Sequence, residues 1–396
     1  MTPSANHDLV LIGGGHSHAL ALRMLAMKPL PGVRITLVSP DALSAYSGML
    51  PGHIAGHYTR DALEIDLVRL ARFAGARLIL GAAEGIDLSR GEVHVAGRPP
   101  VGFDLASIDV GITTAMPEIP GFAEHAIPAK PLERFATAWQ TVLQTSGPAS
   151  VAVIGGGVAG AELILAMGHA LSRAERPAKL HLIERDKVLT ALPARSAARL
   201  REALERAGVT LHEGVEVRAI TSEGVTLEGY EISADFVCGA AGARPHAWLA
   251  ETGLAQQDGY LNIDPQLRTS DPRIFAAGDC AHMPFAPRPK AGVYAVRQAP
   301  VLAQNLRVAL RETGRMHRYS PQKDYLKLVS MGGKTALGDR FGLSFAGPLI
   351  WRWKDRIDRR FMDKFRDLPA MAPPPLPDGT TPDGWPIERP RRIALT

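Results

Sequence analysis

Three glycines and one acid in the middle of the chain have the types and spacing that bind a dinucleotide. Gly155, Gly157 and Gly160 separate an apolar strand-like run from an apolar helical pattern within residues 150–171. In such a turn the first glycine permits a tight bend, the second lets the backbone approach a pyrophosphate, and the third lets helix and strand pack closely. Glu184 ends the next predicted strand, where an acid binds a ribose 2′-hydroxyl and repels a 2′-phosphate. These four residues predict an NAD(H) site.

Two alternatives accompany this motif. Residues 150–171 are about long enough for a membrane span, although the glycine cluster and Glu162 argue against one. Arg185 follows Glu184 directly and could pair with a 2′-phosphate, so the choice between NADH and NADPH stays open.

A second, imperfect copy of the turn lies near the N-terminus. A strand-like run at residues 8–12 precedes it, and His18 stands where the third glycine belongs. Its partner strand ends at Ser39 rather than at an acid. Two such units in one chain indicate two dinucleotides, FAD at the first and a nicotinamide at the second. The candidate residues at the first turn are Gly13, Gly14, Gly15, His16 and Ser17.

His16 and His18 could instead be read as metal ligands. A metal site needs further His, Cys or carboxylate side chains at ligand spacing, and the neighbouring sequence offers none. Polar residues lining a phosphate loop are the favoured interpretation, and no metal is expected.

Two later stretches supply further candidates. Within residues 40–66 any period is broken by Gly48, Pro51, Gly52 and Gly56, which predicts a long irregular loop. Ser47 within it suits a flat cofactor ring, the alternative being a surface loop. Asp279 ends an apolar strand, where it can accept a hydrogen bond from a cofactor hydroxyl or cap the helix that follows.

Composition limits the classes of protein. The chain has 396 residues, 46% of them hydrophobic, and only two cysteines, which favours a soluble protein of two or three domains in a reducing, cytoplasmic setting. The polar N-terminus predicts no signal peptide. The net charge of +5 raises the question of nucleic acid, but no nucleic-acid motif supports that partner.

The order of these patterns predicts an α/β fold with two Rossmann-like dinucleotide-binding domains and a C-terminal α+β region. The predicted FAD-binding domain is discontinuous, at residues 1–121 and 258–318. The predicted NAD-binding domain spans 122–257 and repeats the layout of the first half. A C-terminal domain at 319–369 and a Pro-rich extended tail at 370–396 complete the prediction.

The C-terminal domain contains a basic amphipathic helix, Leu349–Arg366. Its apolar stripe runs from Ile350 to Phe365 and includes Trp353 and Phe361, and basic residues face the other way. Such a helix can lie on a membrane, here the inner face of the cell membrane. The alternatives are packing on its own domain or against a second copy in a homodimer. For Trp353 we expect a place in the core, because nearby Gly and Pro residues indicate a tight turn at the helix start.

Taken together, the motifs GGGHSHAL, IGGGVAGAEL and FAAGDCA resemble the flavoproteins with two dinucleotide-binding domains, which are similar to pyridine nucleotide-disulfide oxidoreductases. The resemblance is strongest to the branch of type II NADH:quinone oxidoreductase and sulfide:quinone oxidoreductase. YSGMLPGHIAGHY and WRWKDRIDRRFM most resemble the flavoprotein domain fused to selenide, water dikinase.

The resemblance implies FAD against Gly13, Gly15 and Asp279, and a nicotinamide dinucleotide against the second turn. It also implies that Glu162 lies near both rings and takes part in proton transfer linked to quinone. The alternative for Glu162 is an acid that the dipole favours in the first turn of a helix.

The departures from the family concern the acceptor. Sulfide oxidation needs a pair of redox cysteines near the flavin. Cys280 stands in its family-typical place after Asp279, so only Cys238 is left and no pair is available. The Ala-Gln pair of the type II enzymes is missing, although Gln298 matches a further Gln, so a quinone acceptor stays open. We expect no selenide, water dikinase domain within these 396 residues, so a selenium role has no support within this chain.

These patterns predict an FAD-dependent oxidoreductase. It would transfer a hydride from NAD(P)H to FAD, and then electrons to a small-molecule acceptor such as a quinone. The alternative is a redox-responsive flavoprotein that binds partners without rapid turnover.

Overall fold

The computed structural model describes residues 7–311 and 313–369, and the predicted tail at 370–396 lies outside them. The helices and strands belong to one compact unit that ends at Arg366. The domain boundaries given above stay a prediction.

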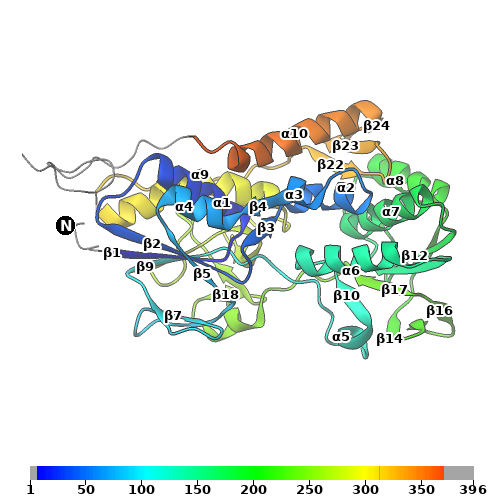
Figure 1. Cartoon of the computed structure of the whole chain (residues 1–396), viewed down its shortest axis with the longest axis horizontal. Helices are drawn as coiled ribbons and strands as arrows, with labels where there is room; N and C mark the ends of the chain where they lie inside the picture. Colours follow the sequence, from blue (N-terminus) through cyan, green and yellow to red (C-terminus); the bar gives the residue numbers. More distant parts are fainter. Residues whose placement is uncertain (1–6, 312, 370–396) are drawn as a thin grey trace, which may run out of the picture. The chain divides into compact units, whose positions relative to one another are not determined.

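The first sheet has five parallel strands in the order β20-β9-β1-β2-β5. Its central strands are apolar and buried, as expected for a parallel sheet that is covered on both faces. In Figure 1 helices α1, α4 and α9 lie above this sheet, and the antiparallel sheet β6-β7-β8 lies below it. The bounds are β1 His7–Ile12, β2 Val33–Ser39, β5 Arg77–Leu80, β9 Leu105–Ile108, β20 Ile274–Ala276, α1 His16–Met27, α4 Leu67–Ala74, α9 Gly292–Arg311, β6 Ala83–Asp87, β7 Glu92–Val95 and β8 Val101–Gly102.

The second sheet repeats this plan with five parallel strands in the order β10-β17-β11-β12-β13. An antiparallel sheet, β14-β15-β16, again accompanies it. The bounds are β10 Ala126–Pro128, β11 Ala149–Ile154, β12 Ala178–Glu184, β13 Val209–Glu213, β17 Phe236–Gly239, β14 Val217–Thr221, β15 Gly224–Leu227, β16 Glu231–Ser233, α5 Phe122–His125, α6 Leu132–Gln144, α7 Val158–Arg173 and α8 Ala194–Arg206. The described part of the chain has no helix that is both long and apolar enough to span a bilayer.

The prediction of an irregular loop at 40–66 is wrong. The segment forms several short helices and strands. Pro51, which was expected to break any regular element, lies in the first turn of α2, where a helix tolerates proline. The elements are β3 Leu43–Ala45, η1 Ser47–Met49, α2 Leu50–Ile54, α3 Arg60–Leu63 and β4 Glu64–Asp66. The Trp139 indole of α6 donates to the Ile54 carbonyl at 3.2 Å, which ties this segment to the second half of the chain.

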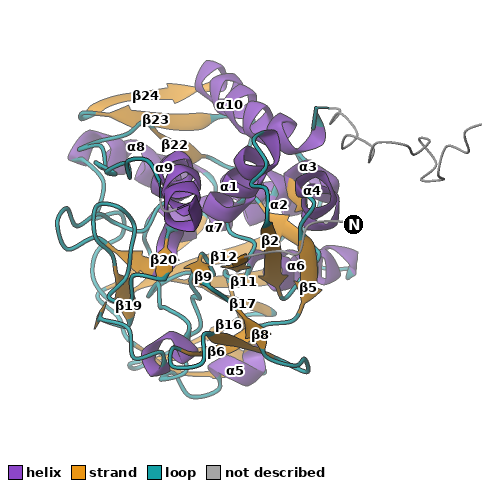
Figure 2. Ribbon diagram, turned by 90° about the vertical axis from the view of Figure 1, so that its left-hand side faces the viewer, coloured by secondary structure: helices purple, strands orange, loops and turns teal. Residues whose placement is uncertain are grey.

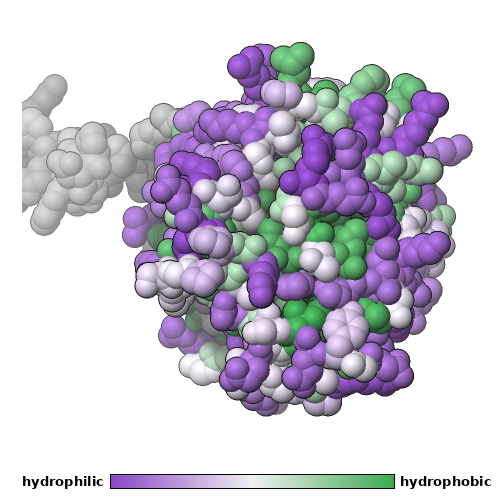
Figure 3. Space-filling view, turned by 90° about the vertical axis from the view of Figure 1, so that its right-hand side faces the viewer, coloured by the Kyte–Doolittle hydropathy of each residue, from purple (hydrophilic) through white to green (hydrophobic). Residues whose placement is uncertain are grey.

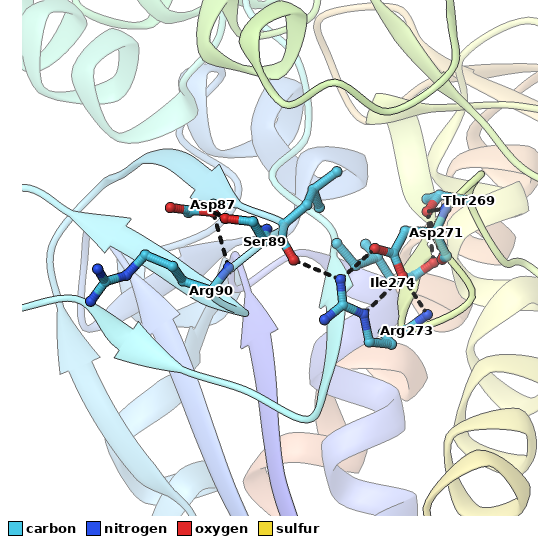
Figure 4. A network of polar contacts seen from close by, with 8 residues as sticks. Asp87, Ser89, Arg90, Thr269, Asp271, Arg273 and Ile274 are labelled. Carbon is cyan, nitrogen blue, oxygen red and sulfur yellow. Dashed lines mark hydrogen bonds and ion pairs between the residues drawn. The ribbon is translucent and has the colours of Figure 1, made fainter.

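A polar network fixes the return of the chain to the first sheet (Figure 4). Arg273, just before β20, pairs with Asp271 and also donates to the Leu88 carbonyl at 2.7 Å, after β6. Asp87 in turn accepts from Ser89 and Arg90. The elements around this return are η2 Ala247–Glu251, β18 Gln256–Gln257, β19 Tyr260–Asn262, η3 Gly278–Cys280 and β21 Ala281–His282.

The C-terminal region is an antiparallel sheet, β22-β23-β24, followed by the long helix α10. Figure 2 shows these elements as a layer above α1, α7 and α9, with the two parallel sheets beneath. The bounds are β22 Lys327–Ser330, β23 Ala336–Arg340, β24 Leu343–Gly347 and α10 Pro348–Arg366.

Candidate functional site

A cavity, here called cavity A, lies where the first glycine turn faces η3 and the start of α9. The structure brings to it most of the residues predicted for FAD. Lys130, Asp109 and Gly292, which the sequence did not single out, line it as well. The predicted residues in its lining are Gly14, Gly15, His16, Ser39, Ser47 and Asp279.

The first turn has the geometry that its glycines predict. Gly13 has φ +96, in the left-handed region that favours glycine, and a Cβ there would collide with the Asp109 backbone. Ser17 is buried, and its hydroxyl donates to the Ala295 carbonyl of α9 at 2.9 Å. Its side chain therefore joins two helices and does not line cavity A.

His18 stands at the position of the third glycine, and its ring bridges two polar groups. One ring nitrogen lies 2.7 Å from the Gly13 carbonyl oxygen, and the other lies 2.8 Å from the Ser107 hydroxyl. Burial lowers the pKa of His18 to about 4, so the ring is neutral at neutral pH. The imidazole thus joins the turn to β9 by hydrogen bonds.

His16 points elsewhere, toward aromatic side chains. Its ring centroid lies 5.3 Å from that of Tyr46 and 5.9 Å from that of Phe361 in α10. Its Nε2 atom is enclosed without a hydrogen-bond partner among the described residues. Across the described ranges, no three His, Cys, Asp or Glu side chains gather as a metal site would require.

Asp279 does not cap a helix, so that alternative is wrong. It lies inside η3, whose N-cap is Ala277, and no side chain caps this short turn. Its carboxylate instead pairs with the Lys130 ammonium at 3.0 Å. Lys130 lies between β10 and α6, 149 residues away in sequence, and no local pattern could have indicated the pair.

A second cavity of about 680 Å³, cavity B, adjoins the first, because Ser47 and Gly292 line both. Glu162 of α7 lines cavity B, and its carboxylate accepts the Ser330 backbone N–H at 2.6 Å. Burial raises the pKa of Glu162 to about 7, and the Lys354 charge only partly opposes that shift. Glu162 can therefore gain or lose a proton near neutral pH.

The outer wall of cavity B is α10, which carries a buried ion pair. Lys354 donates to Asp358 at 2.7 Å and to the Gly48 carbonyl at 2.5 Å. The Tyr46 hydroxyl donates to the other Asp358 oxygen at 3.1 Å. The spacing of four residues on a predicted helix could have indicated the pair, but nothing local indicates its burial.

At the second turn the predicted residues lie together. A Cβ on Gly160 would collide with the Gly155 carbonyl oxygen, as the close packing of strand and helix requires. The Glu184 carboxylate accepts the Gly156 backbone N–H at 2.7 Å and that of Asp186 at 3.1 Å. The acid is therefore held beside the glycines. Gly157 begins α7 as its N-cap.

Comparisons with known proteins agree with this geometry. The family model for pyridine nucleotide-disulphide oxidoreductase matches residues 7–299. The NADH dehydrogenase-like protein YutJ of Bacillus subtilis is 26% identical over 352 residues, which cover 87% of this chain and 94% of YutJ. Nitric oxide reductase FlRd-NAD(+) reductase of Aeromonas salmonicida is 33% identical over 206 residues, covering 50% of each chain.

Among solved structures, sulfide:quinone oxidoreductase from Aquifex aeolicus matches with a TM-score of 0.75 and 18% identity, covering 91% of this chain and 92% of that one. At this identity the likeness shows the fold alone. The comparisons therefore agree with the predicted α/β fold with Rossmann-like cores.

Proposed function

This chain belongs to the pyridine nucleotide-disulphide oxidoreductase family, and we propose that it passes electrons from NADH, through FAD in cavity A, to a quinone in cavity B. The chain is an FAD- and NAD(P)H-dependent oxidoreductase. One observation carries the finer proposal: cavity B meets cavity A at Ser47 and Gly292, so an acceptor there could reach a ring held between the two. The narrower resemblance to the flavoprotein domain fused to selenide, water dikinase stays a prediction.

The residues of cavity A fit FAD. The glycine turn and the start of α1 would hold the pyrophosphate, because the backbone can approach closely there and a helix N-terminus favours an anion. Asp279, held by Lys130, would bind a hydroxyl. When bound, FAD takes a hydride from the nicotinamide and passes electrons on, which is the chemistry of the cofactor.

The residues of cavity B fit an acceptor that must also take up protons. Glu162 holds or releases a proton near neutral pH, for the reasons given above, and the Lys354 ammonium lines the same cavity from α10. Reduction of a quinone to a quinol consumes protons, and a positioned carboxylic acid can supply one.

An acceptor screen tests this proposal. Purified FAD-loaded protein should oxidise NADH for many turnovers with added quinones. In Glu162→Gln we expect flavin reduction by NADH to be unchanged and quinone reduction to fall about tenfold or more. Because the acid form predominates below a pKa of about 7, the wild-type rate should fall as pH rises past that value.

Glu175→Gln is the matched control. Glu175 is exposed just beyond the end of α7, so this variant should behave as wild type. A single flavin reduction without turnover would favour the redox-responsive binding module instead. Rapid turnover at the same rate in the wild type and in Glu162→Gln would show that Glu162 has no role in quinone reduction.

Coenzyme choice provides a second prediction. NADH should reduce the flavin faster than NADPH at equal concentration, because the Glu184 carboxylate accepts from a 2′-hydroxyl and repels a 2′-phosphate. In Glu184→Ala the preference should shrink about tenfold, because the neighbouring Arg185 is mostly exposed and able to meet a phosphate. Stopped-flow flavin reduction measures both rates. Glu223→Ala, which removes an exposed acid away from the glycine turn, should leave the ratio unchanged, and faster reduction of the wild type by NADPH would contradict the assignment.

We also propose that the C-terminal region docks on an anionic membrane surface. Its exposed apolar residues, here called the apolar surface, are Phe341, Leu343, Phe345, Leu349, Trp353 and Ile357. The expectation that Trp353 lies in the core is therefore wrong, since it is 49% exposed. Figure 3 shows apolar residues at the upper edge of this end of the molecule, beside hydrophilic ones.

Two features favour a lipid surface as the occupant. Exposed basic residues of α10 accompany the apolar surface and complement anionic headgroups. Ile357 belongs to the apolar surface and also lines cavity B, so a lipid-soluble acceptor could enter from the bilayer. The basic residues are Arg352, Arg356, Arg360 and Lys364.

Vesicle binding is the corresponding prediction. The protein should sediment with anionic vesicles at low salt and less so at high salt, because salt screens exposed charges over about 8–10 Å. Leu349→Ser with Trp353→Ser should reduce sedimentation at least tenfold and leave FAD content unchanged. Phe361→Ser alone should instead destabilise the protein, since Phe361 is buried. No sedimentation at low salt, or a dimer that the double variant disrupts, would contradict membrane docking.

A further inference from the structure

A carboxyl group occupies the anion-binding end of α1. Asp109 follows β9, is 3% exposed, and has its side chain between Gly15 and Gly278, where a Cβ on either glycine would collide with it. Its carboxylate accepts the His18 backbone N–H at 3.0 Å. That N–H belongs to the first turn of α1, the place where a helix would otherwise attract the pyrophosphate.

The charged and titratable groups around Asp109 do not neutralise it. Asp279 faces it from η3, and the Lys130 ammonium is paired with Asp279. His16 and His18 belong to the first turn of α1, and the His18 ring bonds to the Gly13 carbonyl and the Ser107 hydroxyl instead. Cys280 follows Asp279, and Lys290 donates to the Ala281 carbonyl at 2.6 Å. Among the described residues, no cation forms an ion pair with Asp109.

A pyrophosphate and an ionised carboxylate at one enclosed helix end would repel each other strongly, because a low local dielectric screens them poorly. We propose that FAD binds to the protonated form of Asp109, so that FAD binding takes up a proton at alkaline pH. A protonated Asp109 still accepts the His18 N–H through one oxygen, and its O–H becomes a donor where a carboxylate could only accept. This proposal rests on FAD in cavity A and adds a positioning residue to that site.

The acid–base properties of the neighbours single out Asp109. Burial, reinforced by the Asp279 charge, raises the pKa of Asp109 to about 7, although the His18 N–H opposes the shift. Burial lowers the pKa of His16 and of His18 to about 4. Burial raises the pKa of Cys280 to about 12. Of these four groups, only Asp109 changes charge between about pH 6 and pH 9.

The test is calorimetric titration of FAD into the full chain after removal of its FAD, across that pH range. Below a pKa of about 7 the Kd should stay constant. Above it the Kd should rise about tenfold per pH unit, because the free protein has lost a proton that the complex must regain. Repeating the titration in buffers of different ionisation heat counts the protons taken up, from near zero in acid to about one at alkaline pH.

Two neutral variants and one control make the assignment specific. Asp109→Asn and Asp109→Ser keep an acceptor for the His18 N–H and cannot ionise, so both should bind FAD without pH dependence. At about pH 8.5 Asp109→Asn should bind at least tenfold more tightly than wild type. Asp279→Asn should bind FAD more weakly at every pH yet still take up a proton. The proton uptake should begin at a lower pH than in the wild type, because a negative charge beside Asp109 is gone.

A pH-independent Kd in the wild type would overturn the proposal. So would a pH dependence that survives in both neutral variants, or one that disappears only in Asp279→Asn. Failure of FAD to bind even at about pH 6 would instead overturn the FAD site in cavity A, and the proposal with it.

Discussion

Replacing Gly15 with valine should abolish useful FAD binding, with a loss of affinity of at least about a hundredfold, or about 2.7 kcal/mol. Gly15 is the N-cap of α1 and has φ −64, so backbone strain is not the reason. A Cβ at Gly15 would collide with the Asp109 carboxyl group, which is buried and hydrogen-bonded and has little room to move. The start of α1 must then shift away from the position at which it meets the pyrophosphate.

FAD content after gel filtration and the Kd from titration measure this effect. Gly157→Ala is the matched control, because no atom lies within 4 Å of a Cβ built there, so this variant should keep its FAD. Asp279→Ala should also lower the affinity, since Lys130 would lose its partner. Tight, full FAD occupancy in both Gly15→Val and Asp279→Ala would rule out the assignment of cavity A.

The parts of the site that the sequence predicted are those with local patterns. The second glycine turn and the acid that ends its partner strand lie within about one βαβ unit, where spacing fixes geometry. The first turn was harder, because His18 breaks the motif. Only the structure shows that the His18 ring joins the Gly13 carbonyl and the Ser107 hydroxyl in place of close packing.

The parts that could not be predicted depend on contacts across the chain. Lys130 meets Asp279 over 149 residues, and Lys354 meets the Gly48 carbonyl over 306. Asp109 is an intermediate case, because carboxyl ends of adjacent parallel strands meet at one edge of the sheet. That rule could have placed Asp109 beside the first turn. It could not have shown that the side chain is buried.

The amphipathic helix shows a different limit. One apolar stripe runs along α10, yet Phe361 and Phe365 are buried whereas Trp353 and Ile357 are exposed. Hydrophobic periodicity identifies the face of a helix that avoids water. It does not tell whether the chain itself covers the whole of that face. The exposed part of the stripe is the part that the proposed membrane contact would cover.

Lys354→Met should lower the free energy of unfolding by about 3–5 kcal/mol, because it leaves a buried carboxylate without its partner. The side chains of Lys354 and Asp358 are only 9% and 6% exposed. The substitution also removes the donor to the Gly48 carbonyl and so releases α10 from the segment that lines both cavities. We expect the C-terminal region to loosen first and FAD to bind less tightly.

Denaturant unfolding of the FAD-loaded protein, with Arg352→Ala as the control, measures this loss. Arg352 is exposed on the same helix, so its removal should change the stability by less than about 0.5 kcal/mol. Adding Asp358→Asn to Lys354→Met should recover much of the loss, since the double variant buries no unpaired charge and the amide can still accept from the Tyr46 hydroxyl. Recovery in the double variant identifies the unpaired charge, and not lost packing, as the cause. If Lys354→Met is no less stable than Arg352→Ala, the ion pair does not hold α10 against the flavin-binding half of the molecule.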